Sequence, residues 1–351
     1  MVVIAIMATD TFPNITAESG CSRIAVDVCA VICTHNRTDK LRRAIDSLMA
    51  QRIPPAEILV IDNAPRHDST WRLVRDEFPA VRYVRESIPG LNFARNRALR
   101  ETTLAIVAYL DDDAVVEPDW VAAIQAVFQE DSRIAICTGK VDALCLETEG
   151  QRLFETNGGF GRGDVRIRLP GDAQRLRIHG MRAPLIAWSL SVGVGCSLAV
   201  RRRTIMSFGG FDEALDMGAA LPGGGDVDII WRTVGAGYEV VYEPAVRARH
   251  EHRREVEAAI NQILGHCRAT IAFIVKSAAA ANGSQRLIIV VFLLWRLVKP
   301  GLRLICRIFG RDPLPVPALF RLWWACSRGL TAYAAAKHLA KQRIDALGRL
   351  Q

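Results

Sequence analysis

Three consecutive carboxylates, Asp111, Asp112 and Asp113, are the strongest chemical feature of the sequence. They follow an apolar run over residues 104–110, which is typical of a strand buried on both faces. Adjacent carboxylates repel one another, and a hard cation such as Mg²⁺ or Mn²⁺, which prefers oxygen ligands, would relieve that repulsion. The alternative is a solvated acidic loop before the helix expected near Trp120. Ligands of open α/β sheets bind at this end of the strands.

Polar residues also follow two earlier predicted strands. Thr34, Asn36 and Arg37 come after the first strand, and Asp62 comes after the second. Strands alternate with helical segments, which predicts βαβ units and a largely parallel sheet; the expected strands span residues 25–33, 57–61, 81–84 and 104–110. A nucleotide-type ligand at the rim of that sheet would fit these polar ends. Residues 191–200, apolar with two glycines, are predicted to form a further strand.

The second half of the chain supplies further candidates. Asp226 and Asp228 follow the glycines at 223–225 and fall in the first turn of a predicted helix. Carboxylates are favoured there by the helix dipole, so helix stabilisation alone would explain Asp228. His250 and His252 lie just beyond the strand expected at 238–242. Their spacing alone favours solvated side chains over metal ligands.

Composition restricts the class of protein. The chain has 351 residues, half of them hydrophobic, and a net charge of +8. After residue 250 there are 16 Lys/Arg against 5 Asp/Glu, so the basic character belongs to the last hundred residues. Nine cysteines without a C-x-x-C pair argue against a zinc or redox motif and favour free thiols in a reducing compartment. The apolar piece at 2–8 is too short for a signal peptide, so we expect a cytoplasmic protein.

The C-terminal part is predicted to be helical and amphipathic. The nine apolar residues at 287–295 fall short of the roughly 20 that a membrane span needs. Basic residues then recur every three or four positions beside aliphatic ones, at Arg296, Lys299, Arg303, Arg307 and Arg311. This pattern is typical of a helix in an anionic membrane surface, with a kink at Pro300 and with Trp323 and Trp324 as anchors. The alternative is a helical subdomain that packs on itself or on a second subunit. Nucleic-acid binding is disfavoured, because long aliphatic runs interrupt the basic residues.

Taken in order, the motifs resemble those of the family 2 glycosyltransferases, nucleotide-sugar enzymes with the GT-A fold. The resemblance covers about residues 27–253 and rests on VICTHNR at 31–37, IDN at 61–63, LNFARNR at 91–97, LDDD at 110–113, GGFDE at 209–213, GDVD at 225–228 with Arg232, and YEP at 242–244 with His250.

The resemblance implies a role for each matching residue. Thr34, Asn36 and Arg37 would line the nucleotide pocket. Asp62 would hold the base with Arg95 close by, and Asp111 would lie near the ribose. Asp113, assisted by His250, would bind Mg²⁺ or Mn²⁺ in a D-x-D motif, and Asp112 is grouped with Asp111 among the nucleotide-binding residues. Asp226 would be the catalytic base, and Asp228 would contact the acceptor or support the site.

One departure from the family pattern is Gly225, where the family usually has Glu. It leaves the assignment of Asp226 as base in place and puts in question what the missing Glu does. The Gln/Arg-x-x-Arg-Trp motif of processive polysaccharide synthases is not evident, which favours a transferase that adds a single sugar.

The expected protein is therefore a GT-A α/β domain, Rossmann-like, with a mainly parallel sheet flanked by helices. It would comprise a loose N-terminal arm at 1–24, the catalytic domain at 25–253 and a helical, basic, amphipathic extension at 254–351. The expected function is inverting transfer of a sugar from a nucleotide-sugar donor to a glycan or lipid-linked hydroxyl acceptor, as in polysaccharide biosynthesis, at the inner face of the plasma membrane. The alternative is an inactive family member that acts as a membrane-bound scaffold.

Overall fold

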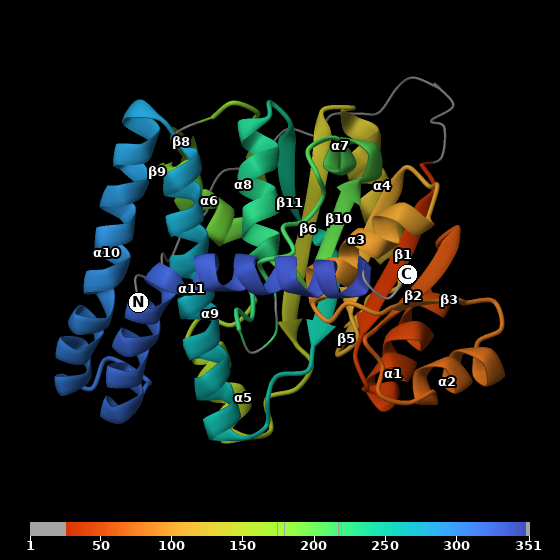
Figure 1. Ribbon diagram of the computed structural model, residues 1–351, viewed down its shortest axis with the longest axis horizontal. Helices are drawn as coiled ribbons and strands as arrows, with labels where there is room; N and C mark the ends of the chain where they lie inside the picture. Colours follow the sequence, from red (N-terminus) through yellow and green to blue (C-terminus); the bar gives the residue numbers. More distant parts are fainter. Residues whose placement is uncertain (1–25, 174, 179, 217, 219, 349–351) are drawn as a thin grey trace, which may run out of the picture.

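The computed structural model describes residues 26–348 except 174, 179, 217 and 219, so the predicted N-terminal arm at 1–24 lies outside the described residues. A single large sheet runs through the molecule in the order β3-β2-β1-β4-β10-β6-β11-β5 (Figure 1). Four parallel strands form its first half: β1 (Val28–Thr34), β2 (Glu57–Asn63), β3 (Arg82–Glu86) and β4 (Ile106–Asp111). The expected α/β fold with a mainly parallel sheet is confirmed.

The second half of the sheet mixes directions. β10 (Ser197–Arg201) runs antiparallel between β4 and β6 (Ile134–Ala143). The long strand β11 (Glu239–His250) pairs parallel with β6 and antiparallel with β5 (Ala114–Val116) and β7 (Ile167–Leu169). A separate hairpin joins β8 (Arg175–Ile178) to β9 (Met181–Pro184).

The register of the parallel strands gathers the polar ends predicted from the sequence. Thr34 at the end of β1 pairs with Asp62 of β2, and Cys33 pairs with Asp111 of β4. The antiparallel pairing of His250 with Ala114 brings the end of β11 to the same rim. Strand direction and register therefore concentrate the candidate residues at one edge of the sheet.

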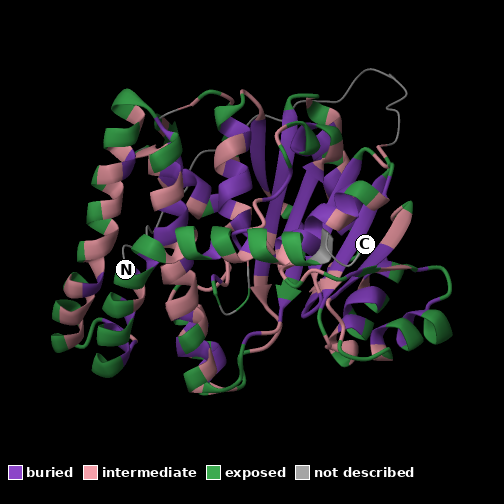
Figure 2. Ribbon diagram, viewed as in Figure 1, coloured by how far each residue is buried: buried purple, intermediate pink, exposed green. Residues whose placement is uncertain are grey.

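Helices cover both faces, and alternate residues of β1 show how. Val28, Ala30 and Ile32 pack into the layer of α1 (Thr38–Met49) and α4 (Trp120–Glu130). Cys29 and Val31 pack into the opposite layer, with α3 (Leu91–Glu101) and α8 (Gly225–Gly235). All five side chains are fully buried, as expected for a strand covered on both faces (Figure 2). The other helices before the C-terminal layer are shorter: α2 (Ser69–Glu77), α5 (Glu149–Thr156), α6 (Leu185–Val192) and α7 (Arg202–Ser207).

The prediction of a strand over residues 191–200 is wrong in its first half. Helix α6 (Leu185–Val192) ends there, and β10 begins only at Ser197. The residues of α6 are almost all apolar and mostly buried, so the sequence has no helical periodicity to distinguish the helix from a strand.

Three long helices form the C-terminal layer: α9 (Val256–Ala280), α10 (Gly283–Ile308) and α11 (Val316–Gly348). Among the described residues, α9 is the one helix long and apolar enough to cross a membrane. It contacts α5, α8, α10 and α11 and buries nine of its side chains, so it forms the core of this layer. Helix α10 continues through Pro300, where the sequence predicted a kink.

Helix α10 carries its apolar residues on the outside. Exposed side chains recur every three or four positions, at Leu287, Val291, Leu294, Trp295, Val298, Leu302, Ile305 and Ile308. Four of its five basic residues, Arg296, Lys299, Arg303 and Arg307, are partly buried, whereas Arg286 near its start is exposed. A helix that packs only on its own protein buries its apolar face. Helix α10 does the opposite, with its apolar face outward and most of its basic residues inward, and we call it inverted for that reason. Phe320, Trp323 and Trp324 of α11 are exposed as well.

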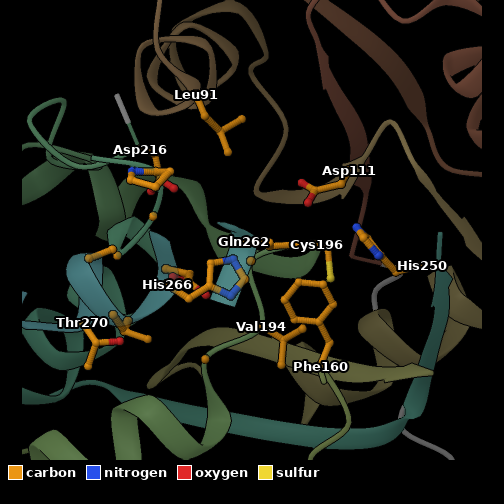
Figure 3. A pocket seen from close by; sticks show the side chains of 18 of the residues that line it. Leu91, Asp111, Phe160, Val194, Cys196, Asp216, His250, Gln262, His266 and Thr270 are labelled. Atoms are coloured by element: carbon orange, nitrogen blue, oxygen red, sulfur yellow. The ribbon is translucent and has the colours of Figure 1, made fainter. Parts of the chain in front are cut away.

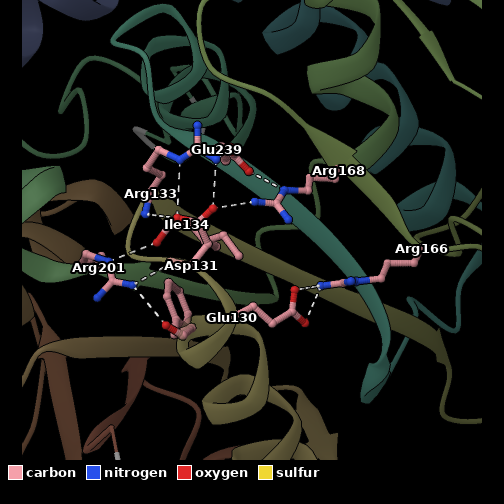
Figure 4. Close-up of polar contacts among 9 residues, drawn as sticks. Glu130, Asp131, Arg133, Ile134, Arg166, Arg168, Arg201 and Glu239 are labelled. Carbon is pink, nitrogen blue, oxygen red and sulfur yellow. Dashed lines mark hydrogen bonds and ion pairs between the residues drawn. The ribbon is translucent and has the colours of Figure 1, made fainter. Parts of the chain in front are cut away.

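At the end of the sheet remote from the polar rim, an ionic network joins the starts of β6 and β11 to β7 (Figure 4). Arg168 pairs with Glu239 and with Asp131, and Arg133 pairs with the same two carboxylates at 3.1 and 3.0 Å. Arg201 donates to the backbone oxygen of Ile134 at 3.1 Å. These contacts hold β6, β7, β10 and β11 together at the end of the sheet opposite the polar rim.

A second ionic cluster links the C-terminal layer to α8. Lys276 of α9 lies 2.6 Å from Asp228 Oδ1 and also pairs with Asp212. Tyr333 of α11 donates to Asp212 at 2.8 Å, and Arg232 pairs with Asp228 at 2.8 Å. Since Asp228 is fully buried, these cations are what compensate its charge.

The Lys276→Met substitution should lower the free energy of unfolding by about 3 kcal/mol, because it leaves buried carboxylates with less compensation. Urea unfolding followed by circular dichroism measures this. Lys341→Met on the exposed side of α11 is the matched control and should change stability by less than about 0.5 kcal/mol. Equal stability of the two variants would show that the cluster does not hold the layers together.

Candidate active site

A cavity of about 460 Å³ lies at the polar rim of the sheet, between the strand ends and the C-terminal helices (Figure 3). Several residues predicted from the sequence line it: Arg37, Arg95, Asp111, Asp113, Asp226 and His250. Others do not line it: Thr34, Asn36, Asp62, Asp112 and Asp228. The structure thus brings the predicted metal ligands and the predicted base into one space.

Asp111, Asp113 and His250 form a group that could hold a metal ion. One ligand atom from each lies within 4.8 Å of the others. His250 Nε2 is 3.1 Å from Asp113 Oδ1. Burial would raise the pKa of Asp113, but the hydrogen bond from His250 and the charges of His250, Arg37 and Lys40 hold that pKa well below its usual value. Two carboxyl groups with an imidazole suit a divalent cation such as Mg²⁺ or Mn²⁺.

Asp112 is held apart from this group. Its carboxylate accepts a hydrogen bond from Thr34 Oγ1 at 2.7 Å and pairs with Arg37 at 2.7 Å. Burial, together with the neighbouring charge of Asp113, raises the pKa of Asp112 to about 7. The three consecutive aspartates are therefore divided: the first and third face the cavity, and the second ties β4 to the end of β1.

The predicted nucleotide residues lie around the ends of β1 and β2. Asp62 is fully buried and accepts a hydrogen bond from Tyr83 at 2.8 Å, and its burial raises its pKa. Asn36 adopts a positive φ of 55° in the turn after β1. Arg95 was expected beside Asp62, but it donates to the backbone oxygen of Gly195 and pairs with Asp216 at 3.6 Å. Arg95, Gly195 and Asp216 all line the cavity.

His252 was expected to be solvated, and that prediction is wrong. Its side chain is 1% exposed and packs against Phe154 and Phe160, with ring centroids 4.8 and 5.9 Å away. His252 Nδ1 lies 3.2 Å from His250 Nδ1, and its Nε2 lies 2.9 Å from Glu155 Oε2. An aromatic cage, which the two-residue spacing cannot reveal, removes this histidine from water.

This chain of contacts orients the imidazole of His250. A carboxylate only accepts, so His252 Nε2 carries the proton that is shared with Glu155. The Nδ1 of His252 is then free to accept from the N–H of His250 Nδ1. A cation bound at the site would take the lone pair of His250 Nε2, the nitrogen that donates to Asp113 when no cation is bound. Such partners fix the tautomer and direction of a metal-binding histidine.

Asp226 lies in the first turn of α8, beyond Gly224, whose φ is 99°. The loop of Gly193 and Gly195 approaches it closely: a Cβ on Gly195 would lie 3.3 Å from Asp226 Oδ2. The helix dipole favours the ionised carboxylate at this position. Asp228, two residues further along α8, forms ion pairs with Arg232 of the same helix and with Lys276 of α9, and so ties α8 to the C-terminal layer.

The structure gives a physical reason for Gly225. A Cβ at this position would lie 2.2 Å from Asp216 Oδ2 and 2.3 Å from Asn92 Nδ2. The Gly225 N–H donates to Asp216 Oδ2 at 2.8 Å. Asp216 itself lines the cavity, and burial raises its pKa to about 6. Its carboxylate therefore occupies the space that a larger residue at 225 would need.

Sequence reasoning missed several residues that line the cavity. Gln262 and His266 come from α9, Arg296 comes from α10, and Phe160 comes from the glycine-rich stretch after α5. Within the C-terminal helices no local motif marks them, because only the packing of α9 and α10 brings them to the strand ends. The aromatic residue within the glycine run at 157–163 was the one available signal. Arg162 of the same stretch also lines the cavity; the basic residues near 162–177 were expected either to meet an anionic acceptor or to lie on the surface.

The sheet, the Asp-Asp-His group at its rim and the carboxylate at a facing helix start are arranged as expected for the GT-A class. The chain belongs to glycosyl transferase family 2, whose sequence model matches residues 29–205. A mannosyltransferase from Pyrobaculum calidifontis shares the fold, with a TM-score of 0.53 and 16% identity over 88% of this chain and 86% of that one.

Two curated relatives extend the comparison. A pre-mycofactocin glycosyltransferase of Mycobacterium tuberculosis is 26% identical over 236 residues, which is 66% of this chain and 44% of the relative. A glucosyl-dolichyl phosphate glucuronosyltransferase of Haloferax volcanii is 24% identical over 120 residues, 32% of this chain and 38% of the relative. The chain thus spans less than half the length of these relatives.

The His252→Phe substitution should weaken Mn²⁺ binding about 10- to 100-fold, because it keeps a ring in the cage but removes the acceptor for His250 Nδ1. Free Mn²⁺, measured by electron paramagnetic resonance, reports the affinity. Glu155→Gln keeps an oxygen acceptor for His252 and should bind within a few-fold of the unmodified protein. Unchanged Mn²⁺ affinity in a folded His252→Phe variant would contradict the orienting role.

Proposed function

We propose that this protein is a metal-dependent, inverting glycosyltransferase that moves a sugar from a nucleotide-sugar donor to a hydroxyl acceptor at a membrane surface. One observation carries the proposal: Asp111, Asp113, His250 and Asp226 line the same cavity. The mannosyltransferase that shares the fold is described as a complex with GDP-Man and Mn²⁺, in line with such a donor and cation. An inactive scaffold is not favoured, since the predicted ligands and base converge.

The donor end of the reaction lies at the strand ends. Asp111, Asp113 and His250 would hold a divalent cation, which supplies Lewis-acid stabilisation for the departing nucleoside diphosphate. Arg37, paired with Asp112 and Asp113, adds positive charge beside the leaving group. The cavity volume lies within the range of small-molecule sites.

Asp226 would act as the base. Its carboxylate accepts the proton of the acceptor hydroxyl while the new bond from that oxygen to the anomeric carbon forms and the bond from that carbon to the diphosphate oxygen breaks. Attack opposite the leaving group inverts the anomeric carbon in one step. No enzyme nucleophile is then needed, in contrast to retaining glycosidases.

Membrane association is supported by the inverted helix α10. Its outward apolar residues would enter the interface, and the exposed Trp323 and Trp324 of α11 would anchor beside them. The excess of basic residues after residue 250 favours an anionic surface. A relative named for acting on a glucosyl-dolichyl phosphate is consistent with a lipid-linked acceptor.

Binding of UDP-, GDP- and dTDP-sugars, measured by calorimetry with Mn²⁺ or with EDTA, tests the donor assignment. One donor should bind only with Mn²⁺. Asp113→Ala should abolish that binding, whereas Asp226→Asn should keep it and lower turnover by about 10²- to 10⁴-fold. Asp345→Asn, exposed on α11, is the control and should behave as the unmodified protein. Folded protein that binds none of the donors would support the inactive alternative.

Co-sedimentation with vesicles of phosphatidylglycerol and phosphatidylcholine tests the membrane assignment. Val291→Glu with Val298→Glu should weaken binding by about tenfold or more, because two exposed apolar contacts are replaced by charges that anionic lipid repels. Met49→Glu with Ile53→Glu makes the same change at exposed apolar residues of the catalytic part and should leave binding unchanged. Equal loss in both double variants, or in neither, would argue against α10 as the binding face.

A further inference from the structure

The arginines of the cavity fall into two groups. Arg37 and Arg95 are paired with aspartates. The other three, Arg162, Arg253 and Arg296, line the cavity without an ion pair among the described residues. We call these three the arginine wall. They come from the stretch after α5, from the loop between β11 and α9 and from α10, so the fold assembles them from separate segments.

Arg162 is the most enclosed of the three. It donates to the backbone oxygens of Gly159 and Gly161 at 3.3 and 3.1 Å, but its Nε is buried and has no partner. Gln262 Oε1, which also belongs to a cavity-lining side chain, is buried and unpartnered too. Buried polar atoms without partners are costly and are uncommon in native proteins. These two atoms indicate a polar ligand on this side of the cavity.

Helix α10 explains how Arg296 reaches the wall. Within its basic row, Arg303 is neutralised by Asp312 at 2.6 Å, and Arg307 donates to the backbone oxygen of Asp312. Arg296 and Lys299 have no ion pair among the described residues. The positive charges of Arg296 and Lys299 are partly buried and repel each other, and a bound anion close to both would offset that repulsion.

We propose that the arginine wall binds a phosphate group of the acceptor. This inference rests on the proposed function. The donor diphosphate belongs with the Asp111–Asp113–His250 group at the strand ends. The wall instead includes Arg296 of α10 and Arg162, which lies close enough to Asp226, the proposed base, to feel the charge of that carboxylate. Guanidinium groups bind phosphate through paired, charge-assisted hydrogen bonds. A phosphate held there would place the acceptor beside the base.

The same geometry connects the site to a lipid surface. Arg296 faces the cavity, and its neighbours Trp295 and Val298 on the same helix are exposed. An acceptor whose phosphate contacts Arg296 could therefore keep an apolar chain along the outer face of α10. A water-soluble glycosyl phosphate offers the same phosphate chemistry without that chain.

Calorimetric titration of the donor-loaded, Mn²⁺-containing protein with farnesyl phosphate, glucose 1-phosphate and inorganic phosphate tests the proposal. At least one phosphate compound should bind. Arg296→Gln and Arg162→Gln should each weaken it on the order of tenfold, with the donor Kd nearly unchanged. Arg311→Gln and Arg328→Gln, which remove equal charge from exposed positions of the same region, should have no effect.

Tighter binding of farnesyl phosphate than of glucose 1-phosphate would assign the site to a lipid-linked acceptor, and the reverse order would assign it to a soluble one. Phosphate binding that survives Arg296→Gln and Arg162→Gln in folded protein would overturn the proposal. Loss of donor affinity in these variants would overturn it as well, because the wall would then serve the donor diphosphate. Failure of every nucleotide sugar to bind the unmodified protein would instead refute the proposed function.

Discussion

The structure depends on keeping several carboxylates together at one edge of a sheet. Asp111, Asp113, Asp216 and Asp226 line one cavity, with Asp112 directly behind it. Burial raises the pKa of Asp111, Asp112 and Asp216, so these groups resist ionisation unless positive charge is close. Arg37 and Arg95 supply part of that charge. A divalent cation between the first and third aspartates would supply more, and the strand register determines where it could lie.

The C-terminal helices complete the site that the sheet begins. Helix α9 supplies Gln262 and His266 to the cavity wall, and its Lys276 compensates the buried charge of Asp228, two residues after Asp226. Helix α10 adds Arg296. Without these helices, the buried charge of Asp228 in α8 would be compensated by Arg232 alone, and the cavity would be open on one side. Residues 26–253 and the C-terminal helices therefore build the site together, although the C-terminal part differs from the rest of the chain in its excess of basic residues.

The parts of the fold set by local rules could be predicted from the sequence. Apolar runs that stop at Asp62 and Asp111 mark strand ends, and a parallel sheet brings such ends together. The environment of His252 could not be predicted, because its cage comes from Phe154 and Phe160, nearly a hundred residues earlier. The periodicity of α10 gave two faces but not which one turns inward. Arg296 reaches the cavity only because the basic face does so.

Gly225 shows how a departure from a family motif can preserve the chemistry of a site. Asp216 adopts a positive φ of 56°, which aspartate tolerates better than most residues, and it accepts the N–H of Gly225. A side chain at 225 would collide with this carboxylate. A carboxylate is therefore present beside Asp226, delivered by the preceding loop and not by the helix. Because Arg95 pairs with Asp216, the arginine, the loop and the glycine form one arrangement, and the glycine alone is no sign of a degenerate site.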